Sequence, residues 1–220
     1  MKITYLGHSC FLLETRAGTR VLIDPYDDKV GYPVPRVAAD VVVLTHEHGD
    51  HAYVEMATGS PKVVRGLKEG GQEHARVAET VKGVKMSTVH TYHDENKGAQ
   101  RGRNAMVLFE ADDVKVLHAG DLGHDLDDAA VKAAAGADVL MIPVGGHYTI
   151  DAKMADVVIG RLRPRAVIPM HFKTEVNAGW PISTIDAFLA GKTHVKRVGH
   201  GVEVKDLPAQ PEVWVMDWKG

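Results

Sequence analysis

The segment from residue 45 to residue 51 constrains this chain more than any other, because it gathers three histidines and an aspartate directly after the apolar run at 41–44. Imidazole nitrogen and carboxylate oxygen both suit zinc and related first-row metal ions. His46 and His48 are two residues apart, so in extended backbone they project to the same side and can hold one ion. Gly49 can turn the chain and aim the next two ligands elsewhere. The segment therefore predicts two adjacent metal sites, with the candidate ligands His46, His48, Asp50 and His51.

Composition indicates an ordinary globular protein. With 220 residues, 45% of them hydrophobic, the chain can bury a substantial core, and we expect one domain over 1–220. The formal net charge of −3 gives no electrostatic case for binding nucleic acid or an anionic membrane. The single cysteine, Cys10, excludes an internal disulfide and favours a reducing compartment, and no run reaches the length of a signal core or a membrane span. We therefore expect a cytoplasmic protein.

Hydrophobic patterning predicts an α/β fold. Strands are expected at 3–6, 10–14, 20–24, 41–44, 61–64, 84–93, 104–110, 114–119, 139–144 and 166–170, and edge strands at 195–198 and 213–216. Helices are expected at 72–79, 126–135, 152–162 and 182–190, with a helical turn or two within 52–58. The glycine- and proline-containing segments 26–39 and 94–103 are expected to be loops. Because strands and helices alternate in the second half, we expect a layered domain with its helices outside.

Several of the expected strands end in a histidine or an aspartate. His93, Asp121 and His171 each follow such a strand, as the segment 45–51 does. In open α/β architectures ligands gather at strand ends, so these side chains can converge although residues far apart in sequence supply them. His90 and His93 are an odd number of residues apart and face opposite sides of a strand. We choose His93, because it stands at the strand end beside a polar loop.

These motifs resemble those of one superfamily. The pattern HxHxDH at 46–51, the pair Gly120-Asp121 and a histidine after a strand at 171 match the signature of the metallo-β-lactamase fold superfamily of binuclear metal hydrolases. Short motifs such as Leu6-Gly7-His8-Ser9 resemble those of its small single-domain branch, which includes ascorbate-6-phosphate-lactonase-like proteins. The resemblance covers almost the whole chain and implies a four-layer αββα sandwich. The resemblance does not identify the substrate, because the superfamily hosts many activities.

The resemblance also implies a binuclear site. One ion would be held by His46, His48 and His93, and the other by Asp50, His51 and His171. Asp121 and a water-derived hydroxide would bridge the two ions, and the hydroxide would attack a carbonyl or phosphoryl group. Asp50 would also orient the nucleophile or shuttle its proton, so Asp50 and Asp121 are the catalytic candidates. Zinc is the expected metal, with manganese, iron and nickel as alternatives.

Other polar residues are candidates for contacting the substrate or for orienting a ligand. They are His8, Asn104, His118, His124, His147 and Lys173, with Tyr148, Arg101 and Arg103 beside them in sequence. His8 either faces the pocket, as the resemblance suggests, or is a simple turn histidine. For each lysine and arginine, binding of a substrate carboxylate or phosphate competes with a solvated surface role.

Three functions remain open from the sequence. The first is a hydrolase of a small lactone, thioester or phosphoester; the second is a phosphodiesterase or nuclease acting on nucleic acid; the third is a non-catalytic metal-binding protein. The complete ligand set favours catalysis, and the acidic net charge disfavours nucleic acid. We therefore expect a small-molecule substrate and no nucleic acid or membrane partner. A homo-oligomer stays open, because Trp214 and Trp218 are either interface anchors or core residues.

Overall fold

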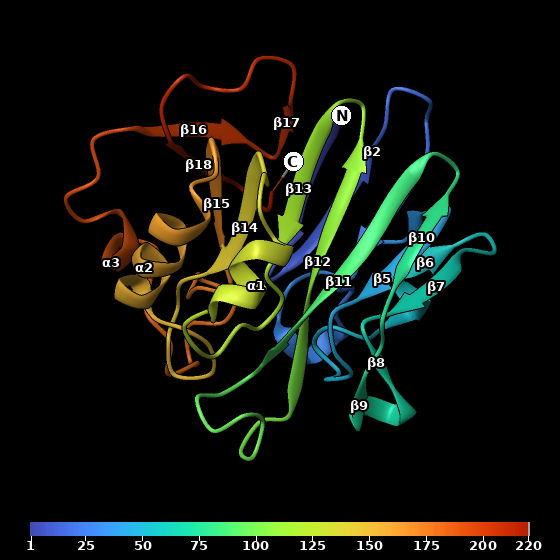
Figure 1. Cartoon of the computed structure of the whole chain (residues 1–220), viewed down its shortest axis with the longest axis horizontal. Helices are drawn as coiled ribbons and strands as arrows, with labels where there is room; N and C mark the ends of the chain where they lie inside the picture. The colour runs from blue at the N-terminus through green and yellow to red at the C-terminus, as the bar shows by residue number, and fades with distance from the viewer. Residues whose placement is uncertain (220) are drawn as a thin grey trace.

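Two β-sheets form the body of the protein (Figure 1). The computed structural model describes residues 1–219, except for the side chain of Glu69, so Gly220 of the expected domain lies outside the described residues. One sheet has six strands in the order β17-β1-β2-β3-β5-β7. The other has eight in the order β10-β11-β12-β13-β14-β15-β18-β16. There are also two short two-stranded sheets, β4 with β6 and β8 (Leu67–Lys68) with β9 (Glu73–His74).

The middle strands of the six-stranded sheet are buried on both faces. Its strands are β1 (Lys2–Gly7), β2 (Cys10–Glu14), β3 (Arg20–Ile23), β5 (Val41–Leu44), β7 (Lys62–Arg65) and β17 (Gly201–Glu203). Side chains alternate across a strand, so in β5 Val41 and Val43 join the main core, whereas Val42 and Leu44 belong to a second apolar cluster. This double burial explains why residues 41–44 read as an unbroken apolar run.

The eight-stranded sheet carries the longest strands and all of the α-helices within residues 1–219. Its strands are β10 (Ala78–Val81), β11 (Val84–Tyr92), β12 (Arg103–Ala111), β13 (Val114–His118), β14 (Val139–Pro143), β15 (Ala166–Met170), β18 (Glu212–Met216) and β16 (Val195–Gly199). The helices α1 (Asp128–Ala133), α2 (Ala152–Leu162) and α3 (Asp186–Leu189) lie on its outer side (Figure 1). Asp127 and Asp151 cap α1 and α2 by accepting backbone N–H bonds.

The outer face of the six-stranded sheet has a different cover. Irregular chain between β3 and β7 lies there, with the 3-10 turns η1 (Asp28–Val30) and η2 (Val54–Met56) and the two-residue strands β4 (Val37–Ala38) and β6 (Ala57–Thr58). Tyr26, Tyr32 and Met56 fill the space beneath this cover. The expected α/β sandwich is confirmed, and among the described residues the layer over this sheet contains loops and 3-10 turns instead of α-helices.

Most of the expected strands are present, and three expectations need correction. The helix expected at 72–79 is wrong, because this segment forms β9 (Glu73–His74) and the start of β10, and the nearby glycines leave too little chain for a stable helix. The helix expected at 182–190 is shorter and covers only α3. Its first residues lie outside the helix, because the Ser183 N–H donates to Gly145 O and Thr184 forms a parallel β-bridge with Lys173. The strand expected at 213–216 is no edge strand, because β18 lies between β15 and β16.

The two C-terminal tryptophans differ in their surroundings. Trp214 is buried in the main core, and Trp218 is half-buried against both apolar clusters. Both are therefore packed within the chain, and whether the protein forms oligomers stays a prediction.

Within residues 1–219, no helix is both long enough and apolar enough to cross a bilayer.

Candidate metal centre

Strand ends bring the polar residues of the candidate site together. β3 runs parallel to β5, and β13, β14 and β15 are parallel to one another, so the carboxyl ends of these strands open at the same end of the sandwich. A histidine or an aspartate follows each of the strands β1, β3, β5, β11, β13 and β15 within three residues. These residues are, in order, His8, Asp24, His46, His93, Asp121 and His171. The convergence expected from the sequence is thus present in the fold.

A fully buried carboxylate, Asp24, fixes two of the histidines. Its Oδ1 accepts the Thr45 backbone N–H at 2.8 Å, and its Oδ2 accepts the Thr45 hydroxyl at 2.7 Å. Because the hydroxyl proton is used in this way, the Thr45 oxygen accepts from His46 Nδ1 at 3.0 Å. Asp24 Oδ2 also accepts from His51 Nδ1 at 2.9 Å. Both rings therefore carry their proton on Nδ1 and turn the lone pair of Nε2 towards the centre.

Asp121 lies at the middle of the centre. Its Oδ2 is 3.1 Å from His93 Nε2, 3.3 Å from His171 Nε2 and 4.0 Å from His46 Nε2. Its Oδ1 is 3.3 Å from His51 Nε2. The Asp121 carboxylate thus lies within 4.0 Å of four histidines.

Two groups of donors flank Asp121. In each group the nitrogen and oxygen atoms lie within 4.8 Å of one another, a spacing that allows them to hold one ion. The first group is His46, His48 and His93, and the second is His8, Asp50, His51 and His171. Several of these buried atoms have no hydrogen-bond partner, namely Nε2 of His46 and His51, Nδ1 of His8, His93 and His171, and Oδ1 of Asp121. Because an unpartnered buried polar atom is costly, the donor set fits bound metal.

The protonation states of His46 and Asp121 suit metal binding. At His51 burial is outweighed by Asp121 and Asp50, which raise the pKa well above 6.5, so this ring has to lose a proton when metal binds. Burial, reinforced by the neighbouring His51, lowers the pKa of His46 well below 6.5, so this ring is neutral at pH 7. Burial opposes ionisation of Asp121, but His171, His51 and His93 outweigh it and hold the pKa of this carboxyl well below its usual range. Neutral imidazole and ionised carboxylate are the forms that bind metal.

His8 turns its ring into the second group. Its backbone has φ = 55°, and its carbonyl accepts the Tyr5 hydroxyl at 2.9 Å and the His171 N–H at 3.0 Å. The ring nitrogen Nε2 lies 3.2 Å from Asp50 Oδ2. Asp24 and His171 also have positive φ, at 46° and 52°. Such strained backbone at non-glycine residues concentrates at functional sites.

Comparison with known proteins agrees with this geometry. Residues 2–171 match the family model described as the β-lactamase superfamily domain. A UPF0173 metal-dependent hydrolase of Korarchaeum cryptofilum is 32% identical over 79% of this chain and 84% of its own length. The chain belongs to the β-lactamase superfamily and, within it, to the UPF0173 metal-dependent hydrolase family.

Other members extend the comparison. A UPF0173 metal-dependent hydrolase of Thermococcus onnurineus is 32% identical over 82% of this chain and 86% of its own length. A crystal structure from Thermotoga maritima, described as a candidate zinc-dependent hydrolase of the metallo-β-lactamase superfamily, superposes with a TM-score of 0.78. It is 37% identical and covers 98% of this chain and 97% of its own. The superfamily expected from the motifs is thereby confirmed.

Asn104 supports the turn that carries Asp121. Its side-chain oxygen accepts the Asp121 N–H at 3.0 Å, and its Nδ2 donates to the Ala119 carbonyl at 2.9 Å. The turn has φ = 55° at Gly120, where a Cβ would lie 2.3 Å from Asn104 Oδ1, so only glycine fits. Asn104 therefore orients the central aspartate from behind, and it does not line the cavities at the site.

The remaining candidates lie in different places. His118 is fully buried, accepts the Gly120 N–H at Nδ1 and donates from Nε2 to Ser9 O, so it packs beneath the centre. His124 bonds the backbone of Tyr92 and Asp125 with its two nitrogens and does not reach the cluster. His147 is exposed and lines an adjoining cavity. Lys173 and Arg103 line neither cavity at the site, and His90 is exposed, away from the metal ligands.

A cavity of about 390 Å³ opens above the metal centre. Its floor is made of residues from both metal groups, and its walls add Gln100, Arg101, Tyr148 and Trp180. Sequence reasoning did not single out Asp24, Gln100 or Trp180. Asp24 had a signal, because it ends a strand in the same way as the other cluster residues do. Gln100 and Trp180 lie in loops, where no periodicity indicates which way a side chain points.

Proposed function

We propose that this protein hydrolyses a small ester-like substrate, a lactone, thioester or phosphoester, with two divalent metal ions. One observation carries the proposal: Asp121 lies within 4.0 Å of histidines from both donor groups, and the inward nitrogens of His46 and His51 have no partner. A structural metal site would be closed by its protein ligands, whereas this cluster opens into a cavity.

Seven residues would hold the ions. His46, His48 and His93 would bind one, Asp50, His51 and His171 the other, and Asp121 both. Ions bound there would lower the pKa of a water so that it attacks at neutral pH, and would polarise the scissile oxygen. Zinc is our first choice, with manganese, iron or nickel as alternatives, because histidine-rich sites accept all of them.

Asp50 is the residue that we assign to proton transfer. Its side chain is 28% exposed and lines the cavity, whereas that of Asp121 is 2% exposed. Burial lowers the pKa of His8 to about 4, so its ring is neutral at pH 7 and donates from Nε2 to the Asp50 carboxylate. This bond orients Asp50 Oδ2, which can take the proton of the attacking water and pass it to the leaving group.

A small molecule fits the cavity better than a nucleic acid. A volume of about 390 Å³ suits a compact ligand, and within residues 1–219 Arg101 is the single lysine or arginine in its lining. Binding of RNA or DNA relies on several phosphate contacts from lysine and arginine. We also propose that the protein works in the cytoplasm, as its single, buried thiol at Cys10 suits.

The experiment is a hydrolase screen of the metal-free protein reconstituted separately with zinc and manganese. Lactones, thioesters, phosphomonoesters and phosphodiesters are the substrates. We expect metal-dependent turnover of at least one class, abolished by a chelator and reduced roughly 10³-fold or more in Asp121→Ala. Full activity after chelation or in Asp121→Ala would overturn the mechanism, and binding of metal without turnover of any class would favour a non-catalytic protein.

A further inference from the structure

The loop between β11 and β12 is held rigidly at the mouth of the cavity. The buried carboxylate of Asp94 accepts four backbone N–H groups, those of Asn96 and Gly98 on Oδ1 and those of Gln100 and Arg101 on Oδ2, at 2.7–3.0 Å. The base of the loop is closed by the bond from His93 N–H to Gly102 O. A loop fixed in this way loses little conformational entropy when a ligand binds.

Arg101 is the residue that this loop presents to the cavity. Its side chain lines both the cavity over the metal centre and the adjoining cavity of about 280 Å³. Among the side chains that the structure describes, no carboxylate oxygen lies within 4.0 Å of its guanidinium.

 The guanidinium of Arg161, by contrast, lies 3.1 Å from Asp125 and 2.6 Å from Asp128. The positive charge of Arg101 is therefore free to meet an anion that enters the cavity.

Aromatic side chains form the wall beside Arg101. The guanidinium carbon lies 5.8 Å from the centroid of the Tyr148 ring, a cation–π distance. Tyr148 meets Trp180 edge-on at 6.0 Å, and Trp180 meets His8 edge-on at 5.4 Å. A guanidinium that stacks on an aromatic face keeps its N–H donors along the edge, where a carboxylate or phosphate can accept two of them. The wall thus leads from an anion-binding group to the metal centre.

We propose that Arg101 determines specificity by binding an anionic group of the substrate, a carboxylate or a phosphate, while the apolar part lies along Tyr148 and Trp180 and the scissile ester reaches the metal centre. This inference rests on the proposed hydrolytic function and names the substrate class. Bound metal ions would attract anions as well. The contribution of Arg101 is therefore the part of the preference for anionic over neutral substrates that is lost when the Arg101 charge is removed.

Matched aryl acetates test the proposal in the metal-reconstituted protein. Three esters carry, at the meta position, a carboxylate, a phosphonate or a neutral carboxamide, which has nearly the shape of the carboxylate. The measured quantity is the ratio of kcat/KM for each anionic ester to that for the carboxamide ester. We expect a ratio above one for the wild type and a roughly 10- to 100-fold smaller ratio for Arg101→Met, the range of one charge-assisted hydrogen-bonded contact. Comparing the two anionic esters distinguishes carboxylate from phosphate as the preferred group.

Two further variants serve as controls. Arg101→Lys keeps the charge and loses the planar fork, so we expect it to retain part of the preference. Lys97→Met removes a positive charge from the same loop at an exposed residue that lines neither cavity, and we expect the wild-type ratio. Equal metal content and equal melting temperature in all variants would show that the centre is intact.

The outcomes separate this inference from the proposed function. If neither these esters nor any class of the screen is hydrolysed with any metal, the proposed hydrolytic function fails. If only another class is hydrolysed, the same three substituents are compared on that class. If the esters are hydrolysed with metal dependence, but the wild type shows no anion preference or Arg101→Met keeps it, the role of Arg101 is overturned and the hydrolytic function stands. An equal loss in Lys97→Met would also overturn it, because the effect would then come from general charge.

Discussion

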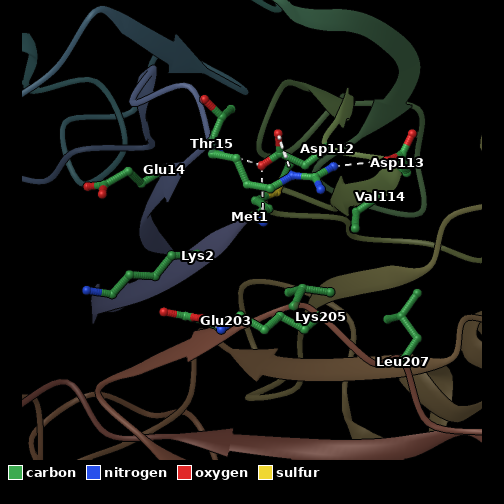
Figure 2. Close-up of a pocket in the computed structure, with 12 residues that line it drawn as sticks. Met1, Lys2, Glu14, Thr15, Asp112, Asp113, Val114, Glu203, Lys205 and Leu207 are labelled. Atoms are coloured by element: carbon green, nitrogen blue, oxygen red, sulfur yellow. Dashed lines mark hydrogen bonds and ion pairs between the residues drawn. The ribbon is translucent and has the colours of Figure 1, made fainter.

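Two pockets at opposite ends of the sandwich show what distinguishes a reactive site from an ordinary hollow. The larger, about 560 Å³, lies where β1 begins and β12 turns into β13 (Figure 2). The metal centre lies beyond the other ends of β1 and β13, and its cavity is about 390 Å³. Volume alone would favour the wrong pocket.

Charge pairing differs between the two. In the larger pocket Asp112 lies 3.1 Å from the amino group of Met1 (Figure 2). Arg16 contacts Asp113 at 2.9 Å, and Lys205 pairs with Glu203. Among residues 1–219, nine buried side-chain nitrogen or oxygen atoms have no partner, and none of them lines this pocket. Six of the nine belong to the metal centre. Unsatisfied buried donors and acceptors, rather than size, therefore mark the place that requires a ligand.

The largest effect that we expect at the metal end, apart from loss of a ligand, follows Asp24→Asn. The asparagine amide would present N–H donors to Thr45 and His51, which now donate to the Asp24 carboxylate. His51 would therefore lose the partner that keeps its proton on Nδ1. We expect metal affinity to fall roughly 10- to 100-fold, as for other residues that orient metal ligands. Titration of the metal-free protein with zinc measures this change.

Asp28→Asn is the matched control, because Asp28 is exposed in η1 and has no contact with the centre. Its metal affinity should equal that of the wild type. Unchanged affinity in Asp24→Asn, with a fold confirmed by circular dichroism, would show that the buried carboxylate does not orient the ligands.

A smaller effect, on stability alone, is expected at the other end for Asp112→Asn. Burial opposes ionisation of Asp112, but the Arg16 N–H and the amino group of Met1 outweigh it and hold the pKa of this carboxyl below its ordinary value. A lowered pKa stabilises the fold above the unfolded value and loses that contribution as the pH falls. We expect Asp112→Asn to unfold about 1 kcal/mol more easily at pH 7.

The same variant should approach the wild type in stability as the pH falls below about 4. Denaturant unfolding at pH 7 and at pH 3.5 measures both differences, and metal-dependent hydrolysis should stay within about twofold of the wild type. A loss of hydrolysis comparable with that of Asp24→Asn would contradict the contrast between the two ends.

The sequence predicted the parts of the fold that rest on hydrophobic pattern. Strands such as β5 and β15 are short apolar runs buried on both faces, a pattern typical of a covered strand. Residues 72–79 were misread because their helix-forming composition is overridden by pairing of β10 with β11, a tertiary contact that no local pattern contains. The prediction of a single domain, and of the cytoplasm as compartment, stays a prediction.

The candidate site was predictable where ligand chemistry follows a strand. His93, Asp121 and His171 lie at strand ends, and the structure brings them to the segment 45–51. Asp24 was missed because its role depends on the parallel pairing of β3 with β5. Arg101 was only one candidate among several cations, since its direction is set by backbone bonds to Asp94 that no sequence pattern reveals.

Asp121, whose carboxylate lies within 4.0 Å of four histidines, is proposed to join two metal sites in one hydrolytic centre. The most direct measurement is a titration of the metal-free protein with zinc, followed by both bound metal and rate of hydrolysis. We predict that two ions bind to each chain, that hydrolysis rises until both are bound, and that Asp121→Ala loses this behaviour. Full activity at a single bound ion per chain, or in Asp121→Ala, would contradict the account.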